Sequence, residues 1–246
     1  MTASVVSLHG ESFPISPSSK SSCSGQLPLA FGYRPTLGRE DFLVAPCNQQ
    51  AVALLDRWPE WTAPSLIIHG PAGCGKTHLA HVWQTRSQAV VLSPNAVRDG
   101  DPPELLRNRT AAVIEDADRI VGAATSERIF LHLYNMLSER QGSLLLTAMI
   151  PIAEWSVDLP DLRSRLAASP AVGVGVPDDA LIGAVLVKMF SDRQLQVNQD
   201  VITYLLARME RSFAAARRIV AVLDTKALAA KRRITIPFAA HVLDGL

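Results

Sequence analysis

The stretch GPAGCGKT, residues 70–77, decides the fold, because it has the spacing G-x-x-x-x-G-K-T of a loop that wraps a phosphate chain. Its glycines permit backbone angles that aim successive N–H groups at phosphate oxygens. The helix expected to follow adds the positive end of its dipole. We expect Lys76 to reach the β and γ phosphates and the Thr77 hydroxyl to bind Mg²⁺. The residues predicted to contact a nucleotide are Gly70, Pro71, Ala72, Gly73, Cys74, Gly75, Lys76, Thr77 and His78.

Alternating strand and helix patterns surround this loop. The apolar run SLIIH (65–69) enters it as a strand, and KTHLAHVWQTRS (76–87) leaves it as a helix. Further strands are expected in 89–93, 110–116 and 143–149, and further helices in 47–58, 102–108 and 126–142. Asn48 and Ser126 are expected to cap the first and last of these helices, and Gly142 to end the last. The alternation predicts an α/β fold whose parallel sheet is covered by helices on both faces.

The residues after Val176 change to a purely helical pattern. Four successive helices are expected in 177–194, 199–210, 212–232 and 236–246, with no strand between them. We therefore expect an α/β nucleotide-binding domain over residues 42–176 and a small all-α lid over residues 177–246. Residues 1–25 are rich in Ser and hold little that could form a core, which predicts a mobile tail or reflects an over-extended start codon.

The composition narrows the class of protein. Of the 246 residues, 48% are hydrophobic and 19% charged, which indicates a globular chain. The net charge of +1 by itself points to neither a nucleic acid nor a membrane. No signal peptide is evident, and the three cysteines lack metal-ligand spacing, so we expect a cytoplasmic protein. Cys74 lies inside the phosphate loop, where it is either a small residue that fits or a redox group.

Two acids follow the apolar run AAVI, residues 111–114. In a phosphate-loop protein a carboxylate at Glu115 binds Mg²⁺ through water, and Asp116 orients the attacking water. The alternative is a pair of solvated acids at a strand end. Glu115 stands where Asp is the common choice, and its extra methylene alters the metal geometry.

Several segments carry a resemblance to a known family. The segments are FLHLYN (130–135), LPDLRSRL (159–166), ITIPF (234–238) and QLPLAF (26–31). With the phosphate loop they make residues 26–246 similar to the DnaA/Hda family of AAA+ proteins, and to its Hda branch in particular. The resemblance implies an AAA+ fold with a helical lid, a bound ADP or ATP with Mg²⁺, and control of replication initiation. The chain ends directly after its helical lid, without the helix-turn-helix domain of a full initiator, which favours the Hda branch.

The resemblance gives the segment 26–31 a partner. In the Hda branch such a peptide binds the DNA polymerase sliding clamp. Gln26 would supply an amide for hydrogen bonding, and Leu27, Leu29 and Phe31 would fill an apolar pocket. Residues 32–41 would then be a linker. From composition alone the same peptide is an ordinary strand or linker that packs on the domain.

The resemblance also assigns Arg165 as an arginine finger that acts in trans. In this family the residue projects into the nucleotide site of a neighbouring subunit, where it stabilises charge on the γ phosphate. The alternatives are a surface arginine paired with Asp161, and a finger at the neighbouring Arg163.

Three departures from the family pattern predict weak or no ATP hydrolysis by the chain alone. Met149 stands where the initiator has an Asp that senses the γ phosphate, and Thr147 replaces that sensor only in part. The lid arginine of the family falls on Ala214, so Arg217 or Arg218 would have to take its place. Glu115 is the third departure.

These observations lead to one expected function and two alternatives. The expected function is regulatory inactivation of DnaA, with the sliding clamp and DnaA as partners and DNA contacted through the clamp. A homodimer is not excluded, and no membrane partner is expected. One alternative is an autonomous ATPase such as a helicase loader, and the other is a clamp-bound adaptor that stimulates nothing. Residues 208–233 hold eight Lys or Arg against two acids, which is either a DNA or partner surface or a solvated face.

Overall fold

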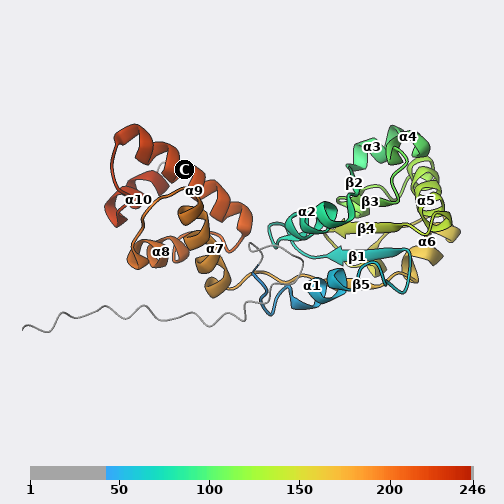
Figure 1. Cartoon of the computed structure of the whole chain (residues 1–246), viewed down its shortest axis with the longest axis horizontal. Coiled ribbons are helices and arrows are strands. Elements are labelled where there is room, and N and C mark those ends of the chain that lie inside the picture. The colour runs from blue at the N-terminus through green and yellow to red at the C-terminus, as the bar shows by residue number, and fades with distance from the viewer. Residues whose placement is uncertain (1–42, 245–246) are drawn as a thin grey trace, which may run out of the picture. The chain divides into compact units, whose positions relative to one another are not determined.

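The computed structural model describes residues 43–244. The predicted tail (1–25), clamp-binding peptide (26–31) and linker (32–41) lie outside the described residues. A five-stranded sheet with strand order β2-β3-β4-β1-β5 runs through the first part (Figure 1). Its strands are β1 (Ser65–His69), β2 (Val90–Leu92), β3 (Ala111–Ile114), β4 (Ser143–Ala148) and β5 (Ala171–Gly173). Every strand pair is parallel, which confirms the predicted fold class.

Helices cover both faces of this sheet because successive strand residues point to opposite sides. In β1, Ile67 joins one apolar cluster with α3, α4, α5 and α6, whereas Leu66 and Ile68 join another with α1 and α2. The helices are α1 (Gln49–Asp56), α2 (Lys76–Ser87), α3 (Pro94–Asp99), α4 (Pro102–Leu106), α5 (Ala124–Glu139) and α6 (Pro160–Ala167). Helices therefore shield both faces of the sheet from water, as expected for strands that are apolar along almost their whole length.

The last described part is entirely helical. It consists of α7 (Asp179–Asp192), α8 (Gln199–Leu206), α9 (Phe213–Ala230) and α10 (Ile236–Leu243). Their buried side chains, from Ile182 to Val242, form an apolar cluster of their own. This is the C-terminal helical lid that the sequence pattern predicts. No helix among residues 43–244 is long and apolar enough to cross a lipid bilayer.

Two predicted helix caps are wrong, whereas the predicted terminal glycine, Gly142, follows α5 (Ala124–Glu139) and its amide donates to Leu137 O at 2.7 Å. Asn48 precedes α1 but does not cap it; its Oδ1 accepts from the Ala45 amide at 2.8 Å. Helix α5 begins at Ala124, so Ser126 lies inside the first turn, where its hydroxyl donates to Ile120 O and Ala123 O. At the other end, Gln141 takes the left-handed conformation with φ of 51°. Gly142 is needed for space, since a Cβ there would lie 2.2 Å from Thr110 O.

Two short elements were not predicted. Helix α3 follows Ser93, whose hydroxyl accepts from the Ala96 amide, and β5 pairs beside β1 over three residues. Both are too short for a hydrophobic period to reveal, and the glycines of VGVGV (172–176) mask the strand further.

Candidate nucleotide-binding site

The phosphate loop joins β1, which lies between β4 and β5 in the sheet, to the start of α2. Gly73 and Gly75 have φ of 74° and 108°, a backbone conformation that residues other than glycine rarely adopt. Both are also crowded, because a Cβ at Gly73 would lie 2.6 Å from the Ser212 Cβ, and one at Gly75 would lie 3.0 Å from the Phe213 ring. Gly73 and Gly75 are therefore required both by their backbone conformation and by the closeness of Ser212 and Phe213.

The start of α9 in the lid contacts this loop directly. The Phe213 amide donates to Gly73 O at 3.0 Å. Ser212 caps α9 by accepting from the Ala215 amide at 3.1 Å, which fixes the turn that touches the loop. Loop and lid are thus joined through the backbone at the point where a phosphate chain would lie.

Lys76 folds back over the loop. Its residue is only 7% exposed, and its Nζ donates to Gly70 O at 2.6 Å and Pro71 O at 2.9 Å. The same nitrogen lies 3.6 Å from the Met149 Sδ. Because carbonyl oxygens hold the ammonium at the loop, its charge is available to phosphate oxygens, which are stronger acceptors. Thr77 and His78 follow in the first turn of α2, and both are exposed.

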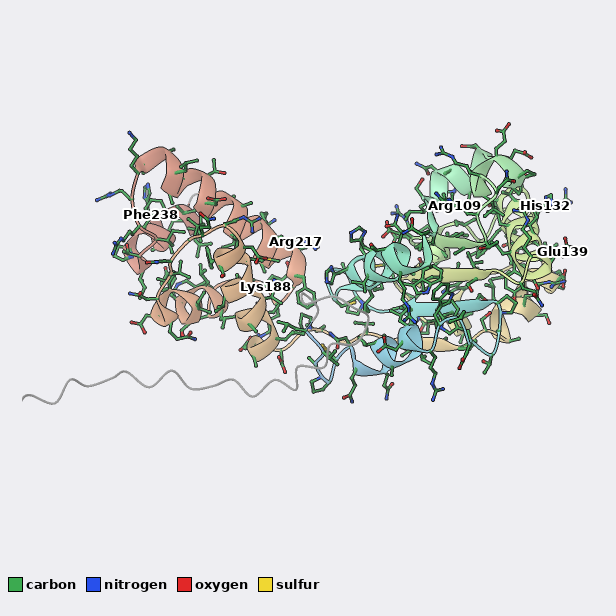
Figure 2. All side chains as sticks on the ribbon, in the orientation of Figure 1. Arg109, His132, Glu139, Lys188, Arg217 and Phe238 are labelled. Atoms are coloured by element: carbon green, nitrogen blue, oxygen red, sulfur yellow. The ribbon has the colours of Figure 1, made fainter. Side chains whose placement is uncertain are left out.

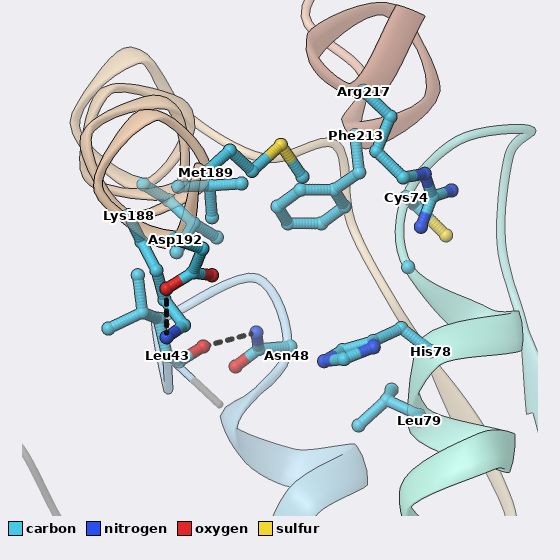
Figure 3. A pocket seen from close by; sticks show the side chains of 13 residues that line it. Leu43, Asn48, Cys74, His78, Leu79, Lys188, Met189, Asp192, Phe213 and Arg217 are labelled. Atoms are coloured by element: carbon cyan, nitrogen blue, oxygen red, sulfur yellow. Dashed lines mark hydrogen bonds and ion pairs between the residues drawn. The ribbon is translucent and has the colours of Figure 1, made fainter. Parts of the chain in front are cut away.

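A cavity of about 250 Å³ adjoins the loop (Figure 3). Cys74, Gly75 and His78 line it from the loop and α2, and Phe213 and Arg217 line it from α9. Figure 3 shows the Phe213 ring facing the space and the Arg217 side chain extending from α9. The remaining lining residues are Leu43, Asn48, Leu79, Leu181, Val185, Lys188, Met189 and Asp192. A mostly apolar hollow with a few polar groups is the kind of site that takes an aromatic ring.

The acids after β3 are tied to the end of β4. Asp116 has φ of 47°, and its amide donates to the Thr147 hydroxyl at 3.1 Å. Its carboxylate lies 3.7 Å from Arg119, and both side chains are exposed. The Glu115 amide donates to Leu92 O, which continues the ladder to β2. The structure therefore brings Asp116 and the predicted sensor Thr147 together at the carboxyl edge of the sheet.

Asp118 is a residue of this edge that sequence reasoning missed. Its Oδ2 accepts from the Met149 amide at 3.0 Å. Its Oδ1 is buried and has no hydrogen-bond partner among residues 43–244. Asp118 thus brings a carboxylate to the backbone of Met149, whose own side chain carries none. The only sequence signal was the short turn Ala117–Arg119 after the acidic pair. Residue spacing alone does not show which carboxylate reaches the end of β4.

The donor set fits a nucleotide that brings its own metal. Among the described residues no group of three or more His, Cys, Asp or Glu side chains could hold a metal ion alone. A Mg²⁺ that shares phosphate oxygens needs only one or two protein ligands, and Thr77 and Glu115 offer a hydroxyl and a carboxylate.

Cys74 is 2% exposed at the centre of the loop. Burial raises the pKa of its thiol, although the charge of Lys76 and backbone amides oppose the shift. A thiol with a raised pKa holds little thiolate at neutral pH, which favours a packing role for Cys74 over a redox role.

Arg165 lies on α6 and is not part of the cluster around the loop. Its guanidinium makes two hydrogen bonds to Asp161, at 3.1 and 3.3 Å, and lies 5.6 Å from the centre of the Tyr134 ring. The side chain is 36% exposed. Arg163 instead donates from Nε and a terminal nitrogen to Val157 O. Of the two candidate fingers, Arg165 is half-buried and its guanidinium contacts only side chains, whereas Arg163 is exposed but its guanidinium is bonded to a backbone carbonyl.

Glu127 is a second residue that the sequence did not indicate, and its carboxylate binds the backbone of residues 158 and 159, which precede α6. It is fully buried, and its carboxylate accepts from the amides of Gly122, Asp158 and Leu159 at 2.7–3.1 Å. Burial raises the pKa of Glu127, but these amides and the charge of Arg163 outweigh it and lower the pKa below its ordinary value. The segment before Arg165 is therefore fixed to α5. A charged residue in an amphipathic helix gives no sequence signal for such a role.

Two sequence comparisons relate this chain to proteins of replication initiation. Residues 179–243 match the family model for the Hda lid domain. The chain is 29% identical over 237 residues to the chromosomal replication initiator protein DnaA of Thermomicrobium roseum. That alignment covers 83% of this chain but only 50% of the relative, so the chain spans half the length of the initiator it matches.

Solved structures show the same fold. Domain III of the Thermotoga maritima replication initiation protein DnaA superposes with a TM-score of 0.71 at 16% identity, covering 84% of this chain and 95% of that chain. The AMPPCP-bound DnaA of Aquifex aeolicus gives a TM-score of 0.66 at 16% identity, covering 81% of this chain and 68% of that chain. At such identity the likeness concerns the fold alone.

Proposed function

Because the chain is a DnaA/Hda-like AAA+ protein, we propose that it is a nucleotide-bound regulator that promotes hydrolysis of the ATP bound to the initiator DnaA. In this proposal the loop 70–77 holds ADP or ATP with Mg²⁺. Residues Gln26–Phe31 dock on the DNA-loaded sliding clamp. Arg165 then enters the nucleotide site of DnaA, so that the chain is a negative regulator of replication initiation.

The observation that carries the proposal is a division between two sets of residues. The loop, the cavity and Arg217 form a setting for a nucleotide within this chain, but Met149 occupies the place beside Lys76. Arg165 lies apart on α6, where its partly exposed side chain contacts Asp161 and Tyr134. Such a division suits a protein that holds a nucleotide as a switch and offers its arginine to a partner.

Each part of the chain has a chemical task in this scheme. The loop amides and Lys76 would bind the phosphates, and the cavity would take the base, with Arg217 as the lid cation. A bound Mg²⁺ supplies charge neutralisation between the β and γ phosphates. Arg165 presents a planar fork of donors, which suits phosphoryl oxygens in a way that lysine does not.

Two other functions make different demands on the site. An autonomous ATPase such as a helicase loader needs a polar sensor at position 149 and has no use for a clamp peptide. A clamp-bound adaptor without stimulating activity needs no exposed Arg165. The Met149–Lys76 contact disfavours the first alternative, and the accessible arginine disfavours the second.

A reconstituted reaction tests the proposal. Hydrolysis of ATP bound to DnaA is measured with the sliding clamp loaded on DNA, in the presence and absence of this chain. We expect a large acceleration that needs both clamp and DNA, because the clamp raises the effective concentration of a weak contact. Gln26→Ala with Leu27→Ala should remove it, whereas Ser21→Ala with Ser22→Ala in the neighbouring predicted tail should not. An unchanged rate with the intact chain would refute the proposal.

A further inference from the structure

The lid concentrates positive charge on one segment. Residues 208–233 hold eight Lys or Arg and two acids, whereas the rest of the chain holds 16 Lys or Arg and 21 acids. The net charge of the whole chain is close to zero, but residues 208–233 are strongly basic and the other residues together are negatively charged. Such a separation of charge creates a local potential that net charge alone does not reveal.

The structure shows which of these charges are already paired. Arg211 is paired with Asp179 at 2.6 Å, Arg208 stacks 3.9 Å from the centre of the Tyr204 ring, and Arg217 lines the cavity beside the loop. No acid among residues 43–244 pairs with the other five, which are Arg218, Lys226, Lys231, Arg232 and Arg233. All five are exposed.

These five charges surround a smooth helical face. Ala221, Thr225 and Ala229 follow Arg218 at intervals of three and four, so they share its side of α9, and all are exposed. Small side chains there leave the helix surface open to close approach. Lys226 lies beside this face, and Lys231, Arg232 and Arg233 follow directly after the last residue of the helix. In Figure 2, side-chain nitrogens project outward from this end of the lid, around Phe238.

Compensation of the helix dipole does not account for so much charge. The C-terminal end of a helix corresponds to about half a negative charge. Lys231, Arg232 and Arg233 bring three positive charges to that end of α9, and Arg218 lies near its beginning. Most of the charge on this face is therefore left for an external anion.

We propose that the exposed face of α9 with the turn Lys231–Arg233 is a contact surface for the phosphate backbone of duplex DNA. Duplex DNA fits better than a single strand, because the face presents small residues and cations but no free aromatic ring for stacking; Tyr204 is covered by Arg208. It fits better than an acidic protein, because five unpaired cations spread along the helix and its end match a regular row of phosphates. The one large apolar side chain exposed on α9, Leu228 at 78%, is too little to form the apolar centre of a protein interface.

Salt-dependent binding of a fluorescent 24-base-pair duplex of arbitrary sequence tests the proposal. We expect binding at low salt to weaken with a log–log slope of about 3–4, as expected for four phosphate contacts. The variant Lys226→Ala, Lys231→Ala, Arg232→Ala, Arg233→Ala should bind at least tenfold more weakly and with a slope lower by about 3. Its ADP-induced change in melting temperature should be that of the wild type.

A matched control removes the same charge elsewhere. Arg57→Ala, Arg107→Ala, Arg109→Ala, Arg140→Ala takes four exposed arginines from the α/β part, and should leave the slope nearly unchanged. Equal losses in both variants, or no binding by the wild type at 25 mM salt, would overturn the proposal. It would be overturned equally if poly-glutamate competed as well as duplex DNA at the same charge, since the surface would then recognise acidic protein. Because no other protein is present, the result is independent of the proposed function.

Discussion

Lys76 is the single residue on which nucleotide binding should depend most. It is buried, and its ammonium is held by two loop carbonyls and so stands ready at the phosphate position. Replacing it by alanine removes the full positive charge of the loop, and no other Lys or Arg among residues 70–77 can replace it.

We expect Lys76→Ala to abolish the stabilisation by ADP. At ADP concentrations about 100 times Kd, linkage adds about 2.7 kcal/mol to the wild type. For a chain of this size that corresponds to an increase in melting temperature of about 5–10 °C. The ADP-induced increase is the quantity to compare, since the variant also loses two internal hydrogen bonds. Lys226→Ala, which removes the same charge from the lid surface, should keep the full increase; an undiminished increase in Lys76→Ala would contradict the assignment.

Arg165 should matter for the partner and hardly at all for the fold. Its pairing with Asp161 is an exposed contact between neighbouring helical turns, and such pairs contribute about 0.3–0.5 kcal/mol. Arg165→Ala should therefore leave the free energy of unfolding and ADP binding nearly unchanged. It should lower the stimulated hydrolysis of DnaA-bound ATP by about 10³-fold, as for other arginine fingers.

The chain offers a sharp control for that experiment. Asp161→Ala breaks the same pair but leaves the guanidinium in place, so it should retain the stimulation. Arg165→Lys keeps the charge without the planar fork and should fail to restore the rate. If Arg165→Ala stimulated fully, the finger would lie elsewhere on the chain, and the proposed switch would remain.

At the scale of elements, the buried Glu127 on α5 organises the segment that leads into α6. Glu127→Gln replaces two carboxylate acceptors by one carbonyl and an amide donor that faces N–H groups. We expect a loss of about 1–3 kcal/mol in the free energy of unfolding, which urea denaturation would measure. Amides of Asp158 and Leu159 should also exchange hydrogen faster. Ser126→Ala, one position earlier, loses bonds to different carbonyls and should leave that exchange unchanged.

The same carboxylate gives the stability a pH dependence of known sign. Because the pKa of Glu127 is lower in the folded state, the unfolded chain binds its proton more readily. The stabilisation is fully present above the ordinary carboxyl pKa and is lost as the pH falls below about 4. The wild type should therefore lose stability in this range more steeply than Glu127→Gln. Parallel curves for the two proteins would show that Glu127 contributes no such term.

Local patterns predict the elements of this fold better than its ends and contacts. The strand before the loop, the helix after it and the four lid helices follow from hydrophobic period and glycine spacing. The caps at Asn48 and Ser126 do not, because the two side chains bond instead to backbone groups of the residues that precede each helix, the Ala45 amide and Ile120 O. The contacts of Glu127 with Asp158, and of Phe213 with Gly73, join residues far apart in sequence. No local pattern encodes them.

At the scale of the whole molecule, the question is whether the bound nucleotide is consumed. Turnover requires a well-placed Mg²⁺, an oriented water and cationic stabilisation of the γ phosphate at the same time. In the proposed site, Glu115 would hold its carboxylate one methylene further from the backbone than Asp would, and Met149 places a thioether 3.6 Å from the Lys76 nitrogen. Arg165 lies on α6 with Asp161 and Tyr134, not at the cavity.

We therefore expect the purified chain to hydrolyse ATP at a rate close to that of Lys76→Ala, measured as released phosphate under saturating ATP and Mg²⁺. The three departures, at Glu115, Met149 and Ala214, act within one catalytic unit, so their effects need not add, and repairing one alone should restore little. Nucleotide binding, measured separately, should remain strong, because the loop, Lys76 and the cavity are intact. Rapid turnover by the isolated wild type, absent in Lys76→Ala, would instead identify an autonomous ATPase. The nucleotide would then be fuel, and Arg165 would have to act between copies of this chain.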